Sequence, residues 1–208
     1  MFHRTPSILS LLYPKLLWRM PADKKDLYLT FDDGPIPQVT EFVLEELSKQ
    51  NIKATFFCIG DNIRKHPEIF KRIVNEGHAI GNHTYNHLKG WQTDPALYLD
   101  NIHKCDNEII VHCPLSIVNC FRPPYGRITP KQIKSIKDKR IVMWDVLTRD
   151  YDATLSAENC LKGSLKAVRN GSIIVFHDSL KAEKNLRYAL PRFIETCLKE
   201  GYTFNALA

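Results

Sequence analysis

The chain has 208 residues, of which 44% are hydrophobic and 25% are charged, and it contains no internal repeat or low-complexity segment. These values are ordinary for one globular domain with a substantial core, and no run approaches the roughly 18 apolar residues of a membrane span. The formal net charge of +6 could suit an acidic partner, but basicity alone reports on non-specific association, so we predict no nucleic-acid binding.

The N-terminal segment allows two interpretations, because residues 8–17 are apolar and follow Arg4, as in a secretory signal peptide. However, Pro14 and Lys15 interrupt this run, and no clear small-residue cleavage site follows it. We therefore expect residues 1–26 to form a folded segment that packs on the domain. The lack of a clear signal peptide favours the cytoplasm, with export as the alternative.

The first half of the chain alternates apolar runs with helical spacing. Residues 27–31 are predicted to form a buried strand that ends at two aspartates, and residues 54–59 a second strand. Helical spacing follows each of them, and the second helix is expected to begin at Pro67 and end at Gly77. A long helix capped by Asp94 is expected to turn three apolar side chains toward the core: Leu97, Ile102 and Ile109.

The second half continues this alternation. Helices are expected to begin at Pro130 and Ser156 and to cover residues 182–199, and strands are expected over residues 140–146, 172–176 and 202–204. Lysines at positions 131, 134 and 137 alternate with isoleucines, which indicates the solvated face of an amphipathic helix. Alternating strands and helices predict parallel strands with helices outside, either as a barrel or as an open doubly wound sheet.

Six cysteines are spread along the sequence, and none belongs to a Cys-x-x-Cys pair. We therefore predict neither a zinc ribbon nor a thioredoxin-like motif. A domain of this size does not need disulfides, so free thiols are expected.

Two histidines and two aspartates form the most informative pattern in the chain. His83 and His87 are four residues apart, so both rings can lie on one side of a helix or tight turn. Asp32 and Asp33 follow the first predicted strand, and adjacent side chains of an extended segment point in different directions. One carboxylate can therefore join the histidines at a metal while the other faces a substrate.

This set of side chains is typical of a metal-dependent hydrolase. Three protein ligands leave one coordination position open for water, whose pKa the metal lowers, and the second carboxylate can accept the proton. An oxygen and two imidazoles suit zinc, and also cobalt, nickel, iron or manganese. We expect one divalent transition metal, with zinc as the first choice.

The wider sequence resembles the polysaccharide deacetylases with a NodB-homology domain, also called carbohydrate esterase family 4. The resemblance runs from about residue 27 to about residue 204. It is carried by ordered segments at residues 29–35, 54–60, 76–87, 121–126, 144–151 and 174–178. It implies a single domain, a distorted and incomplete (β/α)7 barrel, with residues 27–208 as the catalytic domain.

The resemblance also implies individual roles. It assigns Asp33, His83 and His87 to the metal and Asp32 to the general base. His177 would be the general acid that protonates the departing amine, a role suited to a group that titrates near neutral pH.

Further residues would support these groups. The resemblance implies that Arg122 orients the base, that the backbone N–H of Tyr125 helps hold the oxyanion, and that Asp150 tunes the acid histidine. His78 is expected to support the loop that carries the metal ligands. Substrate contacts are expected from Pro124, Trp144 and Tyr151.

One motif departs from the family pattern. The family often reads Asp-x-x-Asp-Trp, whereas this chain has Leu147 in place of the first acid and Tyr151 in place of a tryptophan of the groove wall. Asp150 keeps its position, so the departure affects the substrate more than the reaction.

We therefore expect a metal-dependent hydrolase that removes N-acetyl groups from a GlcNAc-containing polysaccharide or a related amino sugar. An O-acetyl esterase acting on acetylated xylan-type polysaccharide would use the same groups and is an alternative. A catalytically silent carbohydrate-binding protein is a second alternative, although the retained acid, base and ligand residues argue against it. Nothing in the sequence indicates an oligomeric state.

Overall fold

The computed structural model describes residues 3–114 and 118–207. Eight strands form one sheet in which every pairing of named strands is parallel. They are β1 (Asp26–Asp32), β2 (Thr55–Cys58), β3 (Ala79–Asn82), β4 (Cys120–Phe121), β5 (Arg140–Ile141), β6 (Val146–Leu147), β7 (Ile173–His177) and β8 (Thr203–Phe204).

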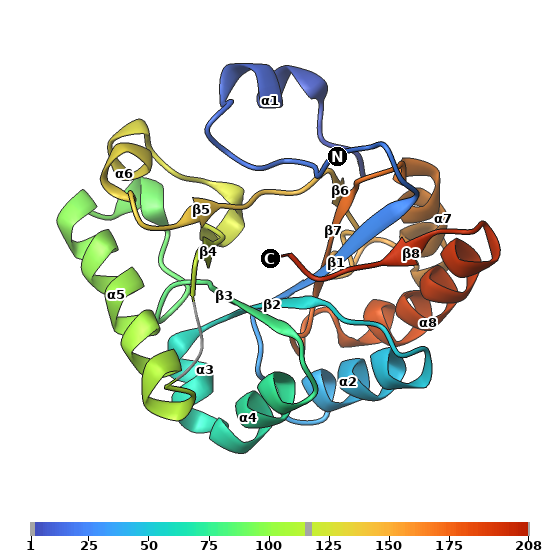
Figure 1. Cartoon of the computed structure of the whole chain (residues 1–208), viewed down its shortest axis with the longest axis horizontal. Helices are drawn as coiled ribbons and strands as arrows, with labels where there is room; N and C mark the ends of the chain where they lie inside the picture. The colour runs from blue at the N-terminus through green and yellow to red at the C-terminus, as the bar shows by residue number, and fades with distance from the viewer. Residues whose placement is uncertain (1–2, 115–117, 208) are drawn as a thin grey trace.

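The order of the strands confirms the barrel and not the open doubly wound sheet. The sheet runs β5-β4-β3-β2-β1-β7-β6, which is the chain order around a circle with an opening between β5 and β6, and β8 pairs with the start of β1. The strands curl together inside a ring of helices (Figure 1). The fold is therefore a distorted, incomplete (β/α)7 barrel, whose polar residues are expected at the C-terminal ends of the strands.

The helices are α1 (Ser7–Leu12), α2 (Val39–Lys49), α3 (Gly60–Lys65), α4 (Pro67–Asn75), α5 (Pro95–His112), α6 (Pro130–Ser135), α7 (Ala157–Ala167) and α8 (Glu183–Lys199). Two short 3-10 turns, Gly90–Gln92 and Pro124–Gly126, lie in loops after β3 and β4. Among the described residues, no helix is long and apolar enough to span a bilayer. All six cysteines are free thiols.

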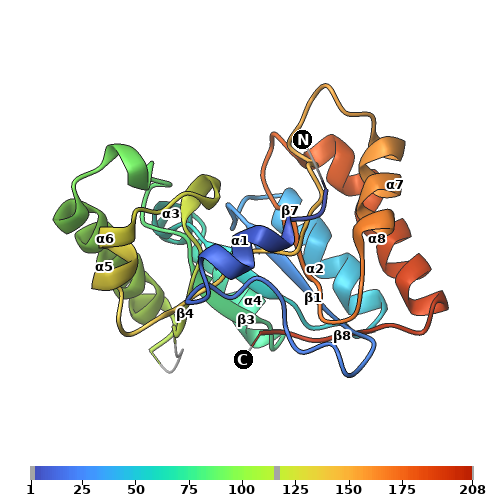
Figure 2. The same ribbon diagram turned by 90° about the horizontal axis from the view of Figure 1, so that it is seen from above.

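The N-terminal segment bridges the opening of the barrel. On one side Leu17 pairs with Val142, just beyond β5, and on the other side Arg4 pairs with Val146 of β6. Leu16 is buried in a cluster with Tyr98 and Phe121. Helix α1, between these contacts, lies clear of the strands at the top of Figure 1 and in front of them when the molecule is seen from above (Figure 2).

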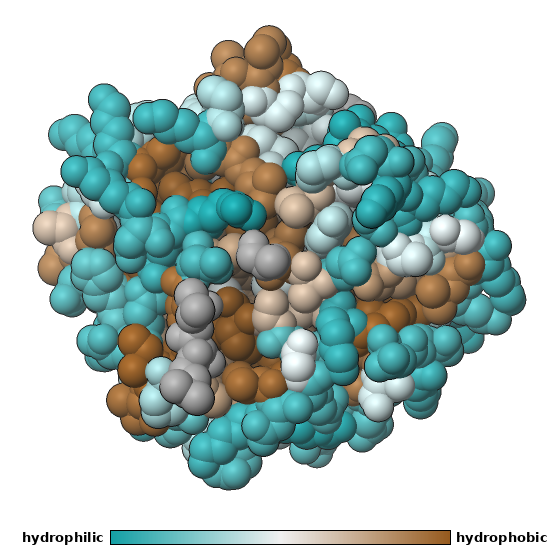
Figure 3. All heavy atoms as spheres, in the orientation of Figure 1, coloured by the Kyte–Doolittle hydropathy of each residue, from teal (hydrophilic) through white to brown (hydrophobic). Residues whose placement is uncertain are grey.

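Helix α1 leaves much of its apolar surface exposed. Leu11 and Leu12 are 75% and 62% exposed, and hydrophobic atoms gather at the top of the surface view, where α1 lies (Figure 3). The helix therefore adds little to the core, in contrast to the neighbouring Leu16.

Successive side chains of β1 point alternately to the hydrophobic cluster under the helices and to the interior of the barrel. Leu29 and Phe31 are buried in the main hydrophobic cluster, where the Phe31 ring stacks 5.0 Å from that of Phe56. Thr30 and Asp32 point the opposite way, and both contact the Arg122 guanidinium inside the barrel. A strand that looks uniformly apolar therefore delivers one carboxylate to the barrel interior.

Some predicted elements differ from the structure. The predicted strand over residues 140–146 is two short strands, β5 and β6, at opposite edges of the opening. Helix α6 ends at Ser135, because Ile136 takes an extended backbone, so Lys137 lies outside the expected amphipathic helix. The helices α1 and α3 and the strands β3 and β4 were not predicted; α3, β3 and β4 are only six, four and two residues long.

The prediction for Leu97 was wrong. This side chain is 64% exposed, whereas Tyr98, Ile102, Cys105 and Ile109 form the buried face of α5. Leu97 is five residues from Ile102, which places it well off the face that the spacing of four, three and four residues defines.

We predict that Leu16 stabilises the domain and that Leu11 does not. Replacing Leu16 with Ala should lower the free energy of unfolding by about 2–4 kcal/mol, because it leaves a cavity among well-packed side chains. The matched change Leu11→Ala, on the exposed face of α1, should stay within about 0.5 kcal/mol. Urea denaturation measures both, and equal losses would show that the segment does not anchor through Leu16.

Candidate active site

The predicted site residues converge at the C-terminal ends of neighbouring strands. Asp32 and His177 are the last residues of β1 and β7 and are opposite each other in the strand register. His83 and Arg122 directly follow β3 and β4. Parallel strands end at the same side of a barrel, so the sheet itself brings together groups that are far apart in the sequence.

Asp33, His83 and His87 form a candidate metal centre. Their ligand atoms all lie within 4.8 Å of one another. Asp33 Oδ1 is 3.7 Å from His83 Nε2 and 3.4 Å from His87 Nε2. It is buried and has no hydrogen-bond partner among the described residues. A buried carboxylate oxygen facing two imidazole nitrogens fits a divalent cation, which would supply the missing partner.

The two histidines are oriented for this role. His83 Nδ1 lies 2.7 Å from the carbonyl oxygen of Arg122, so its N–H can donate there and leave Nε2 free as a ligand atom. Burial and the neighbouring His83 lower the pKa of His87 to about 4, so its imidazole is neutral at physiological pH. Neutral imidazole is the form that binds a metal.

The loops that carry the ligands have unusual backbone conformations. Asp33, Thr84 and His87 have φ angles of 85°, 66° and 57°, in the left-handed region that non-glycine residues seldom occupy. Polar side chains hold these loops: Asn62 donates to the carbonyl of Asp33 at 2.7 Å, and Asn101 accepts from the N–H of Tyr85 at 2.9 Å. The surrounding structure therefore imposes the ligand geometry, as strained functional sites require.

Arg122 holds Asp32 in its ionised form. Both side chains are buried, and Arg122 Nη1 donates to Asp32 Oδ1 at 2.7 Å. Burial alone would raise the pKa of Asp32, but the charges of Arg122, His83 and His177 lower it below its ordinary value. The other oxygen, Oδ2, is 3.9 Å from His83 Nε2 and is therefore directed toward the metal centre.

Asp150 holds His177 through both of its carboxylate oxygens. One carboxylate oxygen is 2.8 Å from His177 Nδ1, and the other accepts the backbone N–H of His177 at 2.7 Å. Burial opposes protonation of His177, yet the negative charge of Asp150 raises its pKa to about 9. The imidazole and the Tyr151 ring pack nearly perpendicular to each other, with centroids 4.9 Å apart.

A cavity of about 670 Å³ opens above these groups. Of the predicted site residues, eight line it: Asp32, Asp33, His83, His87, Tyr125, Trp144, Tyr151 and His177. Arg122 and Asp150 are buried behind the cavity and act on Asp32 and His177. Pro124, a predicted substrate contact, is buried and is not among the lining residues.

Tyr125 lies at the rim, between the metal centre and the solvent. The residue is 52% exposed, and the centre of its ring is 4.5 Å from the centre of the His87 ring. Its φ of 60° turns the backbone sharply, and its N–H donates to no other described residue. This N–H is therefore free for the predicted oxyanion contact, which stays a prediction.

Sequence reasoning missed Asp178, which positions the loop that carries Asp33. Its carboxylate accepts the N–H of Gly34 at 3.1 Å and the hydroxyl of Thr40 at 2.5 Å, and burial raises its pKa to about 8. A Cβ at Gly34 would lie 1.9 Å from Asp178 Oδ2, so only glycine fits there. The adjacency of Asp178 to His177 was the available signal.

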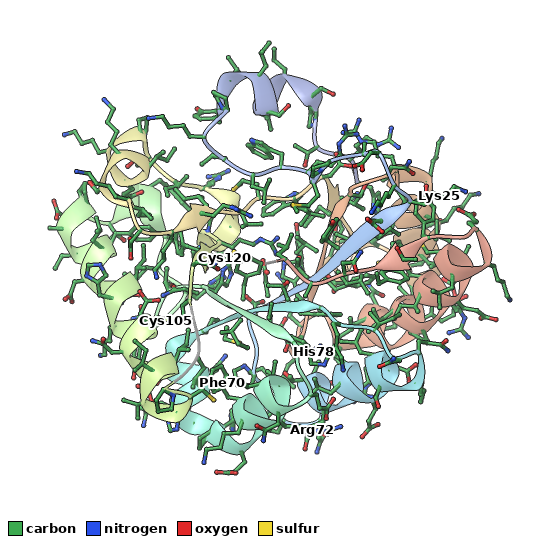
Figure 4. All side chains as sticks on the ribbon, viewed as in Figure 1. Lys25, Phe70, Arg72, His78, Cys105 and Cys120 are labelled. Carbon is green, nitrogen blue, oxygen red and sulfur yellow. The ribbon has the colours of Figure 1, made fainter. Side chains whose placement is uncertain are left out.

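His78 does not support the metal loop as expected. It precedes β3, at the opposite end of that strand from His83, and its Nδ1 accepts the N–H of Ala54 at 3.2 Å. Figure 4 labels it at the start of β3, just after the end of α4. His78 therefore organises the N-terminal ends of β2 and β3.

Comparison with known proteins gives one consistent family. The sequence profile of a family described as polysaccharide deacetylase matches residues 19–144. A peptidoglycan-N-acetylglucosamine deacetylase of Bacillus cereus is 39% identical over 164 residues, covering 76% of this chain and 58% of that protein. A chitooligosaccharide deacetylase of Azorhizobium caulinodans is 38% identical over 166 residues, which are 77% of each protein.

A solved structure agrees along nearly the whole chain. It is a peptidoglycan N-acetylglucosamine deacetylase in complex with 4-naphthalen-1-yl-N-oxidanyl-benzamide, and it is 33% identical to this chain. The superposition has a TM-score of 0.89 and covers 98% of this chain and 95% of the other.

We predict that the purified protein binds one divalent transition metal and that His83→Ala abolishes this binding. The change removes one of three ligands and leaves the buried Asp33 oxygen with a single imidazole. Elemental analysis measures the stoichiometry. His103→Ala, at an exposed histidine of α5, is the matched control, and an unchanged metal content in His83→Ala would contradict the assignment.

We also predict that Asp150→Asn lowers the pKa of His177. The change removes the negative charge that raises this pKa and leaves the effect of burial, so the imidazolium should lose its proton well below pH 9. NMR titration of the zinc-loaded protein measures the shift. Asp152→Asn, in the same loop but paired with Arg149, should leave His177 unchanged; equal shifts in both variants would argue against the specific contact.

Proposed function

This chain belongs to the polysaccharide deacetylase family, and we propose that it removes N-acetyl groups from GlcNAc units of a polysaccharide or a related amino sugar. The observation that supports this most is the meeting of Asp33, His83, His87, Asp32 and His177 at the base of one cavity. The relatives named above, a peptidoglycan-N-acetylglucosamine deacetylase and a chitooligosaccharide deacetylase, support this proposal.

We assign the metal to Asp33, His83 and His87, with zinc as the first choice. When bound, a divalent ion supplies a Lewis acid for the acetyl carbonyl oxygen and lowers the pKa of water. The orphaned Asp33 oxygen and the neutral imidazole of His87 support this assignment.

The base and the oxyanion contact come from different strand ends: Asp32 ends β1, and Tyr125 lies in the loop after β4. Asp32 Oδ2 accepts the proton of the water that attacks the acetyl carbonyl carbon, and the Arg122 contact keeps this carboxylate ionised beforehand. The N–H of Tyr125 donates to the carbonyl oxygen as negative charge develops on it. A backbone donor fixed by its loop needs no reorganisation at that moment.

His177 completes the reaction. It donates the proton at Nε2 to the amide nitrogen as the carbon–nitrogen bond breaks, which releases acetate and a free amine. Its pKa of about 9 keeps it protonated at neutral pH, and Asp150 stabilises the imidazolium through Nδ1. The raised pKa of the acid and the lowered pKa of the base leave both in the required state across the neutral range.

An acetate-release assay over peptidoglycan, chito-oligosaccharides and acetylated xylan tests the proposal. We expect release from the GlcNAc-containing substrates. Release from acetylated xylan alone would replace the proposal with an O-acetyl esterase, and no release from any substrate by metal-loaded protein would leave carbohydrate binding without catalysis.

We predict that Asp32→Asn retains the metal but loses about 10²–10⁴-fold in turnover, the usual contribution of a general acid–base group. Acetate release and elemental analysis on the same preparation separate the two properties. Asp23→Asn, at an exposed position before β1, is the matched control. Near-normal turnover in Asp32→Asn would place the base elsewhere, and loss of metal would make Asp32 a ligand.

A further inference from the structure

The rim of the active-site cavity carries three basic side chains that the proposed chemistry does not use. Lys89, Arg127 and Lys181 line the cavity, and all three are exposed. None of them forms a salt bridge within the described part of the chain. Among the lining residues, the only carboxylates are Asp32 and Asp33, which lie at the base and already face Arg122 and the two ligand histidines.

Aromatic rings hold two of these cations in place. The guanidinium carbon of Arg127 is 4.9 Å from the centre of the Trp91 ring, and Lys181 Nζ is 5.4 Å from the centre of the Tyr151 ring. Such contacts restrain a long side chain and keep its charge at the surface. Because their rotamers are restrained before a ligand arrives, binding of an anion loses less conformational entropy.

The cations lie on both sides of the reacting groups. Lys89 and Arg127 belong to the loops after β3 and β4, and Lys181 belongs to the loop after β7. Strands β3 and β7 are separated in the sheet by β2 and β1, and β1 carries Asp32 at its end. A saccharide chain that places one unit over the metal centre therefore brings its neighbouring units to basic side chains in both directions.

We propose that this rim binds carboxylates on the sugar units that flank the reacting GlcNAc, so that the preferred substrate is an acidic polymer and not a neutral one. The proposal rests on the deacetylase function above and adds the charge of the substrate to it. Arg127 and Lys181 are then specificity-determining residues, and they select the polymer through units that do not react.

The test compares acetate release from three oligosaccharides of equal length. One is a neutral chito-oligosaccharide, one carries lactyl-ether carboxylates on alternate sugars, and one alternates GlcNAc with a uronic acid. Comparing the two acidic oligosaccharides shows whether the rim prefers a lactyl-ether carboxylate or the carboxylate of a uronic acid. We expect the wild-type protein to have a higher kcat/KM on at least one acidic oligomer, and we expect this preference to fall as salt rises.

The variants identify the side chains responsible. Arg127→Gln and Lys181→Gln should each lower the ratio of acidic to neutral kcat/KM by about two- to fivefold, the usual range for an exposed ion pair, and the double variant by about tenfold. Lys131→Gln and Lys184→Gln remove exposed lysines nearby in the sequence that do not line the cavity, and they should keep the wild-type ratio. An unchanged ratio in the rim variants would overturn the proposal.

A binding arm separates this proposal from the deacetylase function. Trp91 and Trp144 line the cavity, so quenching of tryptophan fluorescence reports binding of the same oligomers to the zinc-loaded protein. If no oligomer releases acetate, the deacetylase function fails. Tighter binding of the acidic oligomers, lost in the rim variants, would still support carboxylate binding at the rim. Equal binding of acidic and neutral oligomers would refute the proposal that the rim binds carboxylates, even if the protein is an active deacetylase.

Discussion

The buried contact between Arg122 and Asp32 organises both halves of the active site. A buried guanidinium is costly unless its donors are satisfied, and here they reach Asp32, the Thr30 hydroxyl and the carbonyls of Val142 and Met143. The backbone carbonyl of the same arginine accepts from His83 and so fixes a metal ligand. One residue therefore sets the ionisation of the base and the orientation of the metal centre, and a change at Arg122 would disturb both.

The end of the adjacent strand β7 carries the reverse arrangement of charges. A positive charge beside a buried carboxylate lowers the pKa of Asp32, and a negative charge beside a buried imidazole raises the pKa of His177. Neither partner needs to touch the substrate. The fold thus separates the groups that react from the buried groups that set their charge, and the strand register holds Asp32 and His177 opposite each other.

Much of this arrangement could be predicted because it follows strand ends. Apolar runs located β1 and β7, and the polar residues after them converge through the geometry of a parallel barrel. The residues that hold the loops of the site, and several that line its cavity, could not be predicted. Asp178 acts through a glycine that is far away in the sequence. Trp91 reaches the cavity from a loop whose path includes the left-handed residues Thr84 and His87, and Lys181 reaches it from the loop after β7. Hydrophobic periodicity carries no information about such turns.

The way the N-terminal segment bridges the barrel links a distant part of the chain to the reactive carboxylate. Leu17 exchanges backbone hydrogen bonds with the segment just beyond β5: its N–H donates to the carbonyl of Ile141, and its carbonyl accepts the N–H of Met143. The carbonyls of Val142 and Met143 in that segment hold the Arg122 guanidinium. A protein trimmed to begin at residue 19, where the family match starts, would keep every residue that reacts. It would lose the backbone hydrogen bonds that support the segment holding Arg122, so the point at which a recombinant chain begins also affects the ionisation of Asp32.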